Sequence, residues 1–340
     1  MNLQIEHIPK LVYSSDEEQG YTRRPWGRGF TYLDWEGKRL KDRTILKRIK
    51  SLVIPPVWEE VWICPLENGH LQSTGRDPKK RKQYIYHPDW MRFQQQKKFD
   101  KLVHFAEQLP KLRQTTRLHL QDEKWTRRKV LALIVQVLDE CYIRIGNLQY
   151  KERNNTYGLT TLRRKHVDVA SNHLSFSYKA KSNQYREVNI EDQHLVQLIK
   201  ECSELPGYEV FRYRSGSKTH PVDSSEVNAY VQTIMGEQFY SKDFRTWAGT
   251  SLAVKYVEAA REESEQDSRR TMESCLIKKV ASDLGNTVSV CRDYYIHPKV
   301  LAAAVNNELP SMESVAPPLI KRFENELEPH EIVTYQVINS

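Results

Sequence analysis

The chain has 340 residues, which is long enough for one large domain or two unequal domains with a packed core. Its formal net charge of +8 fits a polyanionic partner, and its 28% charged and 10% aromatic residues exclude a disordered chain. No run approaches the ~18 apolar residues of a membrane-spanning helix. The N-terminus also lacks a basic start followed by an apolar run, so no signal peptide is predicted.

The five cysteines are far apart and form no CxxC motif or Cys/His pair at metal-ligand spacing. An odd, dispersed set of this kind is typical of reduced thiols in a cytoplasmic protein. It predicts neither a disulfide framework nor a metal site.

The first part of the chain has the pattern of a small sheet-rich domain. Residues 1–20 are polar and are expected to form a loose leader. Residues 21–90 contain short alternating apolar runs that are broken by turn signals such as Asn68-Gly69. Between these runs, residues 42–52 have the apolar spacing of a helix.

From residue 91 onward the apolar spacing becomes helical. One helix is expected to end at Pro110, because proline disrupts a helix interior. The strongest helical stripe covers residues 125–142 and leads directly to Arg144. Residues 91–305 are therefore expected to form a larger, mainly helical domain.

Two segments of the second half depart from this helical pattern. Residues 166–190 change to a period of two around a turn at 181–183, which predicts a β-hairpin with Lys181 at its turn. Residues 306–340 are acidic, with proline breaks and a Glu-rich helix candidate, and are expected to form a C-terminal tail. Together the segments predict an α+β chain.

Five polar residues of the second half form a set that could attack a phosphodiester without a metal ion. Arginines would neutralise the non-bridging oxygens, a lysine would protonate the leaving oxygen, and a tyrosine would be the nucleophile. Their order and flanking residues carry the signal, since each alone has a common structural explanation. The set is Arg144, Lys181, Arg245, Asn286 and Tyr295.

The sequence blocks around these residues resemble the type IB DNA topoisomerases of the poxvirus and bacterial kind, over roughly residues 20–305. In the first domain the resemblance rests on residues 27–30, 54–58, 61–65, 75–77 and 81–88. In the second it rests on residues 143–147, 157–162 and 242–250 and on the segment around Tyr295. The resemblance implies a small N-terminal domain and a tyrosine recombinase-like catalytic domain that clamp around duplex DNA.

By this resemblance, Tyr295 is the nucleophile that forms a 3′-phosphotyrosyl bond and leaves a free 5′-hydroxyl. Its distance of nine residues from Asn286 selects it over the neighbouring Tyr294. Arg144 and Arg245 are the phosphate-binding arginines, for which a planar, permanently charged guanidinium is suited. Neither ATP nor any other cofactor is expected, because the covalent bond conserves the energy of the broken phosphodiester.

The other two members of the set have alternative interpretations. Lys181 matches the general acid of the family, although Lys179 lies two residues away on the same hairpin. Asn286 occupies a position where poxvirus members carry histidine and bacterial members can carry asparagine. An amide can donate a hydrogen bond but cannot titrate, so it could only stabilise the transition state. A helix-capping role after Gly285 is the alternative for Asn286.

A second group of residues is predicted to contact DNA. Around residues 79–86, basic and aromatic side chains alternate near a turn, so that some could neutralise phosphates and others could reach into a groove. Lys242 stands where tyrosine recombinases would be expected to show histidine, and Asn147 flanks Arg144. The predicted DNA-binding residues are Arg81, Lys82, Gln83, Tyr84, Tyr86, Asn147 and Lys242.

The favoured function is relaxation of supercoiled duplex DNA by a monomeric bacterial enzyme in the cytoplasm, associated with the nucleoid. A tyrosine site-specific recombinase or integrase shares the catalytic set, but Lys242, Asn286 and the N-terminal Pro-Pro-Val-Trp block argue against it. A basic DNA-binding protein without catalysis is the non-enzymatic alternative, and the intact set of five argues against that. A metal nuclease lacks clustered acidic and histidine ligands.

Overall fold

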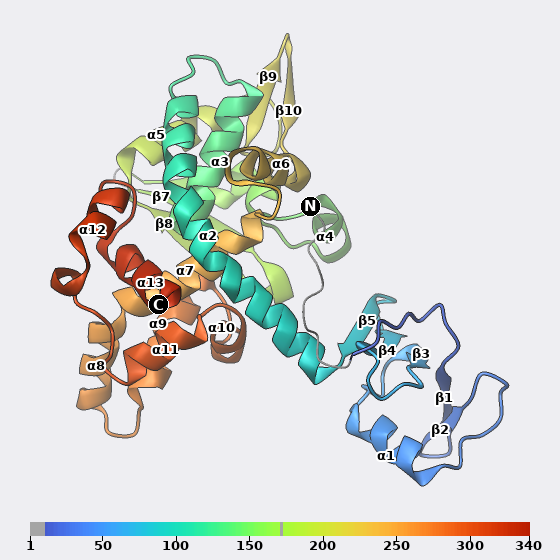
Figure 1. The fold of residues 1–340 in the computed structure, drawn as a ribbon. Helices are drawn as coiled ribbons and strands as arrows, with labels where there is room; N and C mark the ends of the chain where they lie inside the picture. The colour runs from blue at the N-terminus through green and yellow to red at the C-terminus, as the bar shows by residue number, and fades with distance from the viewer. Residues whose placement is uncertain (1–10, 171–172) are drawn as a thin grey trace. The chain divides into compact units, whose positions relative to one another are not determined.

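The computed structural model describes residues 11–170 and 173–340, and the chain divides into two compact units between Lys98 and Phe99 (Figure 1). The first unit is an antiparallel sheet with one helix. Its elements are β1 (Tyr21–Trp26), β2 (Gly29–Leu33), α1 (Arg43–Ser51), β3 (Glu59–Ile63), β4 (Leu71–Arg76) and β5 (Lys82–Tyr86). The strand order is β2-β1-β3-β4-β5, so β5 is an edge strand.

Helix α1 forms where the sequence predicts it, because Asp42 caps its first turn and an apolar face covers the sheet. The Asp42 carboxylate accepts hydrogen bonds from the backbone amides of Thr44 and Ile45. Ile49 packs with Tyr21, Val61 and Ile63 in a small core on one side of the sheet.

Residues 11–20 do not form the loose leader that was expected from their polarity. Val12 forms a bridge with Gly69, and the Ser14 hydroxyl donates to the carbonyl of Leu71 at 3.0 Å. The prediction for residues 1–10 lies outside the described residues. The Ser14 and Asp16 side chains therefore contact the sheet, whereas Glu17, Glu18 and Gln19 are exposed.

The second unit is mainly helical, with two small sheets. Its helices are α2 (Pro88–Leu120, which starts in the first unit), α3 (Arg127–Cys141), α4 (Leu148–Asn154), α5 (Gln193–Ser203), α6 (Ser224–Met235), α7 (Ser241–Lys255), α8 (Val257–Gln266), α9 (Met272–Leu284), α10 (Val288–Tyr294), α11 (Pro298–Val305), α12 (Pro317–Phe323) and α13 (Pro329–Asn339). Strands β6 (Val167–Val169), β7 (Leu174–Lys179) and β8 (Tyr185–Ile190) make one sheet, and β9 (Arg212–Ser215) and β10 (Lys218–Pro221) make a hairpin. A sheet-containing unit followed by a mainly helical one confirms the α+β class.

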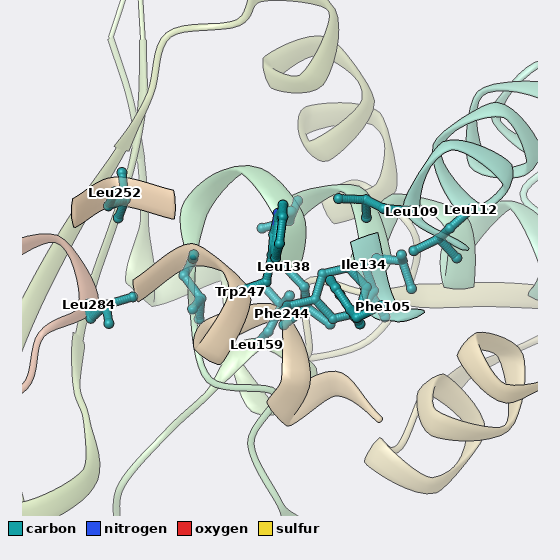
Figure 2. Packing of buried hydrophobic residues seen from close by; sticks show 14 of the residues in the cluster. Phe105, Leu109, Leu112, Ile134, Leu138, Leu159, Phe244, Trp247, Leu252 and Leu284 are labelled. Atoms are coloured by element: carbon teal, nitrogen blue, oxygen red, sulfur yellow. The ribbon is translucent and has the colours of Figure 1, made fainter. Parts of the chain in front are cut away.

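Helix α7 lies at the centre of this unit and is buried along nearly its whole length. Phe244 and Trp247 of α7 pack with Phe105 and Leu109 of α2 and with Ile134 of α3 (Figure 2). Because α7 touches so many neighbours, the side chains that it presents are held rigidly.

Helix α2 runs through Pro110, so the prediction that it ends there is wrong. Proline removes one backbone hydrogen bond from a helix and normally bends or ends it. Here Phe105, Leu109 and Leu112 on both sides of the proline are fully buried, and their packing keeps the helix continuous. Tertiary packing therefore outweighs the local preference.

The segment after residue 305 is not a tail. Helix α13 packs against α7 and α11, and Ile332, Val333 and Tyr335 belong to the main core of the unit. The acidic residues that suggested a solvated tail include Glu331, which is only 5% exposed and takes part in a buried ionic network.

Candidate active site

Four of the five predicted catalytic residues come from one region of the second unit. Arg144 follows the end of α3, Asn286 follows the end of α9 and Tyr295 follows the end of α10. Arg245 lies on the second turn of the buried helix α7 and is 4% exposed. Helix ends leave backbone carbonyls without helical partners, and the arginine side chains bind them here.

The two predicted phosphate-binding arginines both reach the end of α9. Arg144 donates to the side-chain oxygen of Asn286 and, at 3.4 Å, to the carbonyl of Gly285. Arg245 donates to the carbonyl of Tyr142 and, at 2.7 Å, to the carbonyl of Leu284. Since these acceptors are neutral, the positive charge of both guanidinium groups remains uncompensated by any ion pair within the described part of the chain.

Burial, together with the charge of Arg144, lowers the pKa of Arg245 to about 10, and Tyr295 opposes the shift. A pKa of about 10 still leaves the side chain charged at neutral pH. The site thus concentrates positive charge in a region from which water is largely excluded, where an anion would be bound strongly.

Tyr295 packs beneath Arg245, with the guanidinium carbon 5.3 Å from the ring centroid. Its backbone carbonyl accepts a hydrogen bond from the Thr250 hydroxyl at 3.1 Å. A Cβ at Gly249 would lie 2.7 Å from the same carbonyl oxygen, so only glycine allows α7 and Tyr295 to come this close. By contrast, Tyr294 is 41% exposed.

Two buried donors of this region have no hydrogen-bond partner among the described residues: Nε of Arg245 and Nδ2 of Asn286. Leaving a buried donor unsatisfied costs ~1–3 kcal/mol, so such groups are uncommon and call for an explanation. Since Arg144 donates to the oxygen of the Asn286 amide, the NH₂ group is the end of that amide left to bind an acceptor.

Lys181 lies on the turn between β7 and β8, as predicted, and is exposed. Within the described residues it forms no ion pair or hydrogen bond with Arg144, Arg245 or Asn286. The structure therefore brings together Arg144, Arg245, Asn286 and Tyr295, and leaves Lys181 at the tip of a hairpin.

Arg186 of β8 is a site residue that the sequence reasoning missed. It is 9% exposed, and its guanidinium donates to the carbonyls of Asp283 and Leu284, both at 2.5 Å. The signal was the alternation of the strand, in which Tyr185 and Glu187 point outward and Arg186 points inward. An arginine at the inward position of a strand needs hydrogen-bond acceptors. Here the acceptors are the last two backbone carbonyls of α9.

The remaining predicted contacts of this unit have local structural roles. Asn147 caps α4, with its side-chain oxygen accepting from the amide of Gln149 at 2.8 Å. Lys242 is exposed on the first turn of α7, where its amine lies 5.3 Å from the ring centroid of Tyr240. Both positions face away from the buried core, and neither role prevents a contact with DNA.

In the first unit, the predicted DNA-binding residues lie on and beside the edge strand β5. Lys82, Tyr84 and Tyr86 alternate with Gln83, and the two tyrosine rings stack with centroids 5.9 Å apart. Gln83 was expected to reach into a groove together with the tyrosines, but adjacent strand residues point to opposite faces. On its own face, Gln83 donates to Asp77 at 3.1 Å.

Two of the basic side chains of this surface already have acidic partners. Arg81 forms an ion pair with Asp77 at 2.6 Å, and Lys82 forms one with Asp16 at 2.6 Å. Hydrogen bonding to Asp16 raises the pKa of Lys82. A DNA phosphate would therefore compete with these carboxylates for the two cations.

A buried ionic network lies beside Trp247 in the second unit. Arg113 of α2 binds Asp139 of α3 at 2.7 Å and Glu331 of α13 at 2.7 Å, and Glu331 accepts from Trp247 Nε1 at 2.7 Å. A cavity of about 510 Å³ adjoins the network and is lined by none of the five predicted catalytic residues. The network thus ties three elements to α7, two residues from Arg245.

Comparison with known families identifies the family of this chain. Residues 81–313 match the model of the catalytic core of eukaryotic DNA topoisomerase I, and residues 29–77 match that of the N-terminal domain of bacterial DNA topoisomerase IB. Because the first match covers more than half of the chain, the chain belongs to the type IB DNA topoisomerase family, whose members are isomerases. The segment after residue 313 lies outside both matches.

The chain is also similar to individual proteins. The chain is 27% identical over 297 residues to DNA topoisomerase 1B of Acanthamoeba polyphaga mimivirus, an alignment that covers 85% of this chain and 88% of the viral protein. Two structures of the XerH site-specific recombinase with difH DNA, post-cleavage and pre-cleavage, align with a TM-score of 0.35 at 16% and 15% identity. They cover 55% and 56% of this chain and about half (47% and 49%) of theirs.

The described residues contain no helix that is both long and apolar enough to cross a membrane. Among the same residues, no three His, Cys, Asp or Glu side chains are arranged to hold a metal ion.

Proposed function

We propose that Tyr295 attacks a DNA backbone phosphate and that Arg144, Arg245 and Asn286 stabilise the charge that develops there. The Tyr295 hydroxyl loses its proton to solvent as its oxygen bonds to phosphorus, and the bond from phosphorus to the 5′ oxygen breaks. The strand swivels before the reverse reaction reseals it. The supporting observation is the pair of unsatisfied donors, Arg245 Nε and Asn286 Nδ2, in the region that holds Tyr295. Preorganised donors of this kind stabilise a transition state at no cost of reorganisation.

Lys181 is proposed as the general acid that gives its proton to the departing 5′ oxygen. An alkoxide is a poor leaving group, so protonation accelerates the cleavage step. The exposed hairpin tip is compatible with this role if the bound duplex approaches the turn, and Lys179 on β7 is the competing residue.

The DNA partner is proposed to lie across the basic and aromatic surface of β5 in the first unit and across the active site in the second. Lys82 and Arg81 would exchange Asp16 and Asp77 for phosphates, while Tyr84 and Tyr86 would contact the groove or sugars. Lys242 and Asn147 would add contacts beside Arg245 and Arg144. We propose that the two units enclose the duplex as a clamp and that a monomer is sufficient.

We also propose a bacterial type of enzyme that acts on nucleoid DNA in the cytoplasm. The bacterial N-terminal family model and Asn286 in place of histidine support this. The dispersed, reduced cysteines are consistent with the location.

The test is relaxation of negatively and positively supercoiled plasmids by the purified full chain in EDTA without ATP. We expect both plasmids to be relaxed, because the phosphotyrosyl bond conserves the energy for resealing. A requirement for ATP or a divalent cation would contradict the proposal. Exchange of strands between duplexes carrying repeated sites would indicate a recombinase instead.

Asn286→Ala should slow strand cleavage by ~10²–10³-fold, the usual effect of removing one preorganised donor. Asn286→Asp keeps the shape but replaces the donor by an acceptor, so it should be slower still. Single-turnover cleavage of a labelled duplex measures both variants. A rate within twofold of wild type for Asn286→Ala would show that this donor does not serve the phosphate.

A further inference from the structure

Arg186 connects two parts of the active site that otherwise come from distant parts of the sequence. It lies on β8, opposite Tyr178 of β7, in the hairpin whose turn carries Lys181. Its two terminal nitrogens bind the carbonyls of Asp283 and Leu284, which end helix α9. The next two residues of the chain are Gly285 and Asn286.

The contact at the end of α9 is closely fitted. Gly285 has φ +57°, and a Cβ there would lie 2.6 Å from Nη1 of Arg186. The carbonyl of Leu284 accepts from both Arg186 and Arg245. A displacement of the hairpin would therefore be transmitted directly to the turn after α9. This turn presents Asn286 and leads into α10 and Tyr295.

The charged guanidinium of Arg186 is buried, which is unfavourable in free energy. This argues against a role only as a cap of helix α9. Burial lowers the pKa of Arg186 and Arg144 adds to the shift, while Tyr178 and Asp283 oppose it only in part. Within the described residues its guanidinium binds backbone carbonyls and forms no ion pair with a carboxylate. Burying an unpaired charge is unfavourable, and a neutral side chain could fill the same space. The planar fork, however, can hold two carbonyls in a fixed geometry, which an amine cannot.

We propose that Arg186 is a positioning residue that holds the Lys181 hairpin in register with Asn286 and Tyr295. It rests on the proposed role of Lys181 as general acid. Loss of Arg186 releases the hairpin and displaces the proton donor, which impairs the departure of the 5′ oxygen. Arg144 and Arg245 still bind the carbonyls of Gly285 and Leu284 at the end of α9, so the attack by Tyr295 is largely retained.

The test compares two duplexes that differ in one atom at a cleavage site mapped with the wild-type enzyme. One has the natural 5′ oxygen at the scissile bond, and the other has sulfur there. With sulfur the phosphorus–sulfur bond breaks, and a thiolate leaves without needing a proton, since thiols have a pKa of about 8.5. Single-turnover cleavage is measured for wild type, Lys181→Ala, Arg186→Gln, Arg186→Lys and Asn286→Ala.

We expect Lys181→Ala and Arg186→Gln to be slowed by ~10²-fold or more on the oxygen duplex, as for loss of general acid catalysis. Both should return to within a few fold of wild type on the sulfur duplex. Arg186→Lys should fall between, because it keeps the charge but not the fork. Asn286→Ala should stay slow on both duplexes, because its donor serves the non-bridging oxygens.

Recovery on sulfur also shows that a variant is folded, and Arg186→Lys supplies the measurement if Arg186→Gln does not fold. Recovery of Lys181→Ala without recovery of the Arg186 variants would overturn this inference alone. Failure of Lys181→Ala to recover would overturn the role of Lys181 and the inference with it. Normal cleavage of the oxygen duplex by the Arg186 variants would also overturn it.

Discussion

Tyr295→Phe is expected to abolish relaxation, with a loss of ~10⁴-fold or more, as when the nucleophile of a covalent enzyme is removed. Phenylalanine keeps the ring that packs beneath Arg245 and lacks only the hydroxyl that would bond to phosphorus. The fold and DNA binding should therefore be retained. Cys291 cannot replace the hydroxyl, because burial raises the pKa of its thiol to about 12 and keeps it protonated.

The covalent intermediate gives the most direct measurement of this result. A duplex labelled at the 5′ end of the cleaved strand should become linked to wild-type protein on a denaturing gel and should not become linked to Tyr295→Phe. Tyr294→Phe is the matched control, since that ring is the exposed neighbour, and it should relax plasmid within a few fold of wild type. A covalent adduct that survives in Tyr295→Phe and disappears in Tyr294→Phe would reverse the assignment.

Arg113→Met is expected to have the largest effect on stability, a loss of ~3–5 kcal/mol in the free energy of unfolding. The substitution leaves Asp139 and Glu331 as neighbouring buried carboxylates without their shared cation. Arg117→Met is the matched control on the same helix, because the Arg117 side chain is 52% exposed and its pair with Glu326 should contribute at most ~1 kcal/mol. Urea unfolding of the three proteins measures the difference.

The loss of unfolding free energy in Arg113→Met should depend on pH. The pKa shifts of the buried carboxylates determine the direction of this dependence. Burial raises the pKa of Asp139, and Arg113 offsets this only in part. Burial alone would also raise the pKa of Glu331, but the charge and hydrogen bonds of Arg113 outweigh it and lower that pKa. In wild type the group thus stabilises the fold above its unfolded pKa of about 4.3 and loses this contribution as pH falls. Without Arg113 the carboxylates favour the protonated form, so the difference between the proteins should widen from pH 4 to pH 7. Equal losses at both pH values would contradict this account.

Short blocks of sequence predicted much of the site, because four of its members stand at helix ends or on a buried helix with recognisable neighbours. The blocks around Arg144, Arg245, Asn286 and Tyr295 each specify a local structure that brings the side chain to the same place. The apolar spacing likewise located α1, α3 and the hairpin of Lys181. These features depend on residues close together in the chain.

The errors concern residues whose role depends on distant contacts. Pro110 sits within a continuous helix because Phe105, Leu109 and Leu112 are held by packing that no local pattern reveals. In the sequence, Glu331 is one of several acidic residues in a predicted tail. Its partners Arg113 and Trp247 are distant in the chain, so the local pattern does not reveal its burial. Arg186 was overlooked because its partners are backbone carbonyls, which leave no trace in residue identity.

The position of α13 has a consequence for how the protein is made. Translation delivers all five proposed catalytic residues before it delivers Glu331 and the apolar face of α13, which complete the packing around α7. A nascent chain that already contains Tyr295 still lacks the last support of the helix that carries Arg245. We expect ribosome-bound chains that stop before α13 to be unable to nick DNA, so that during synthesis the ability to break a strand arises only once the helical unit can close its core.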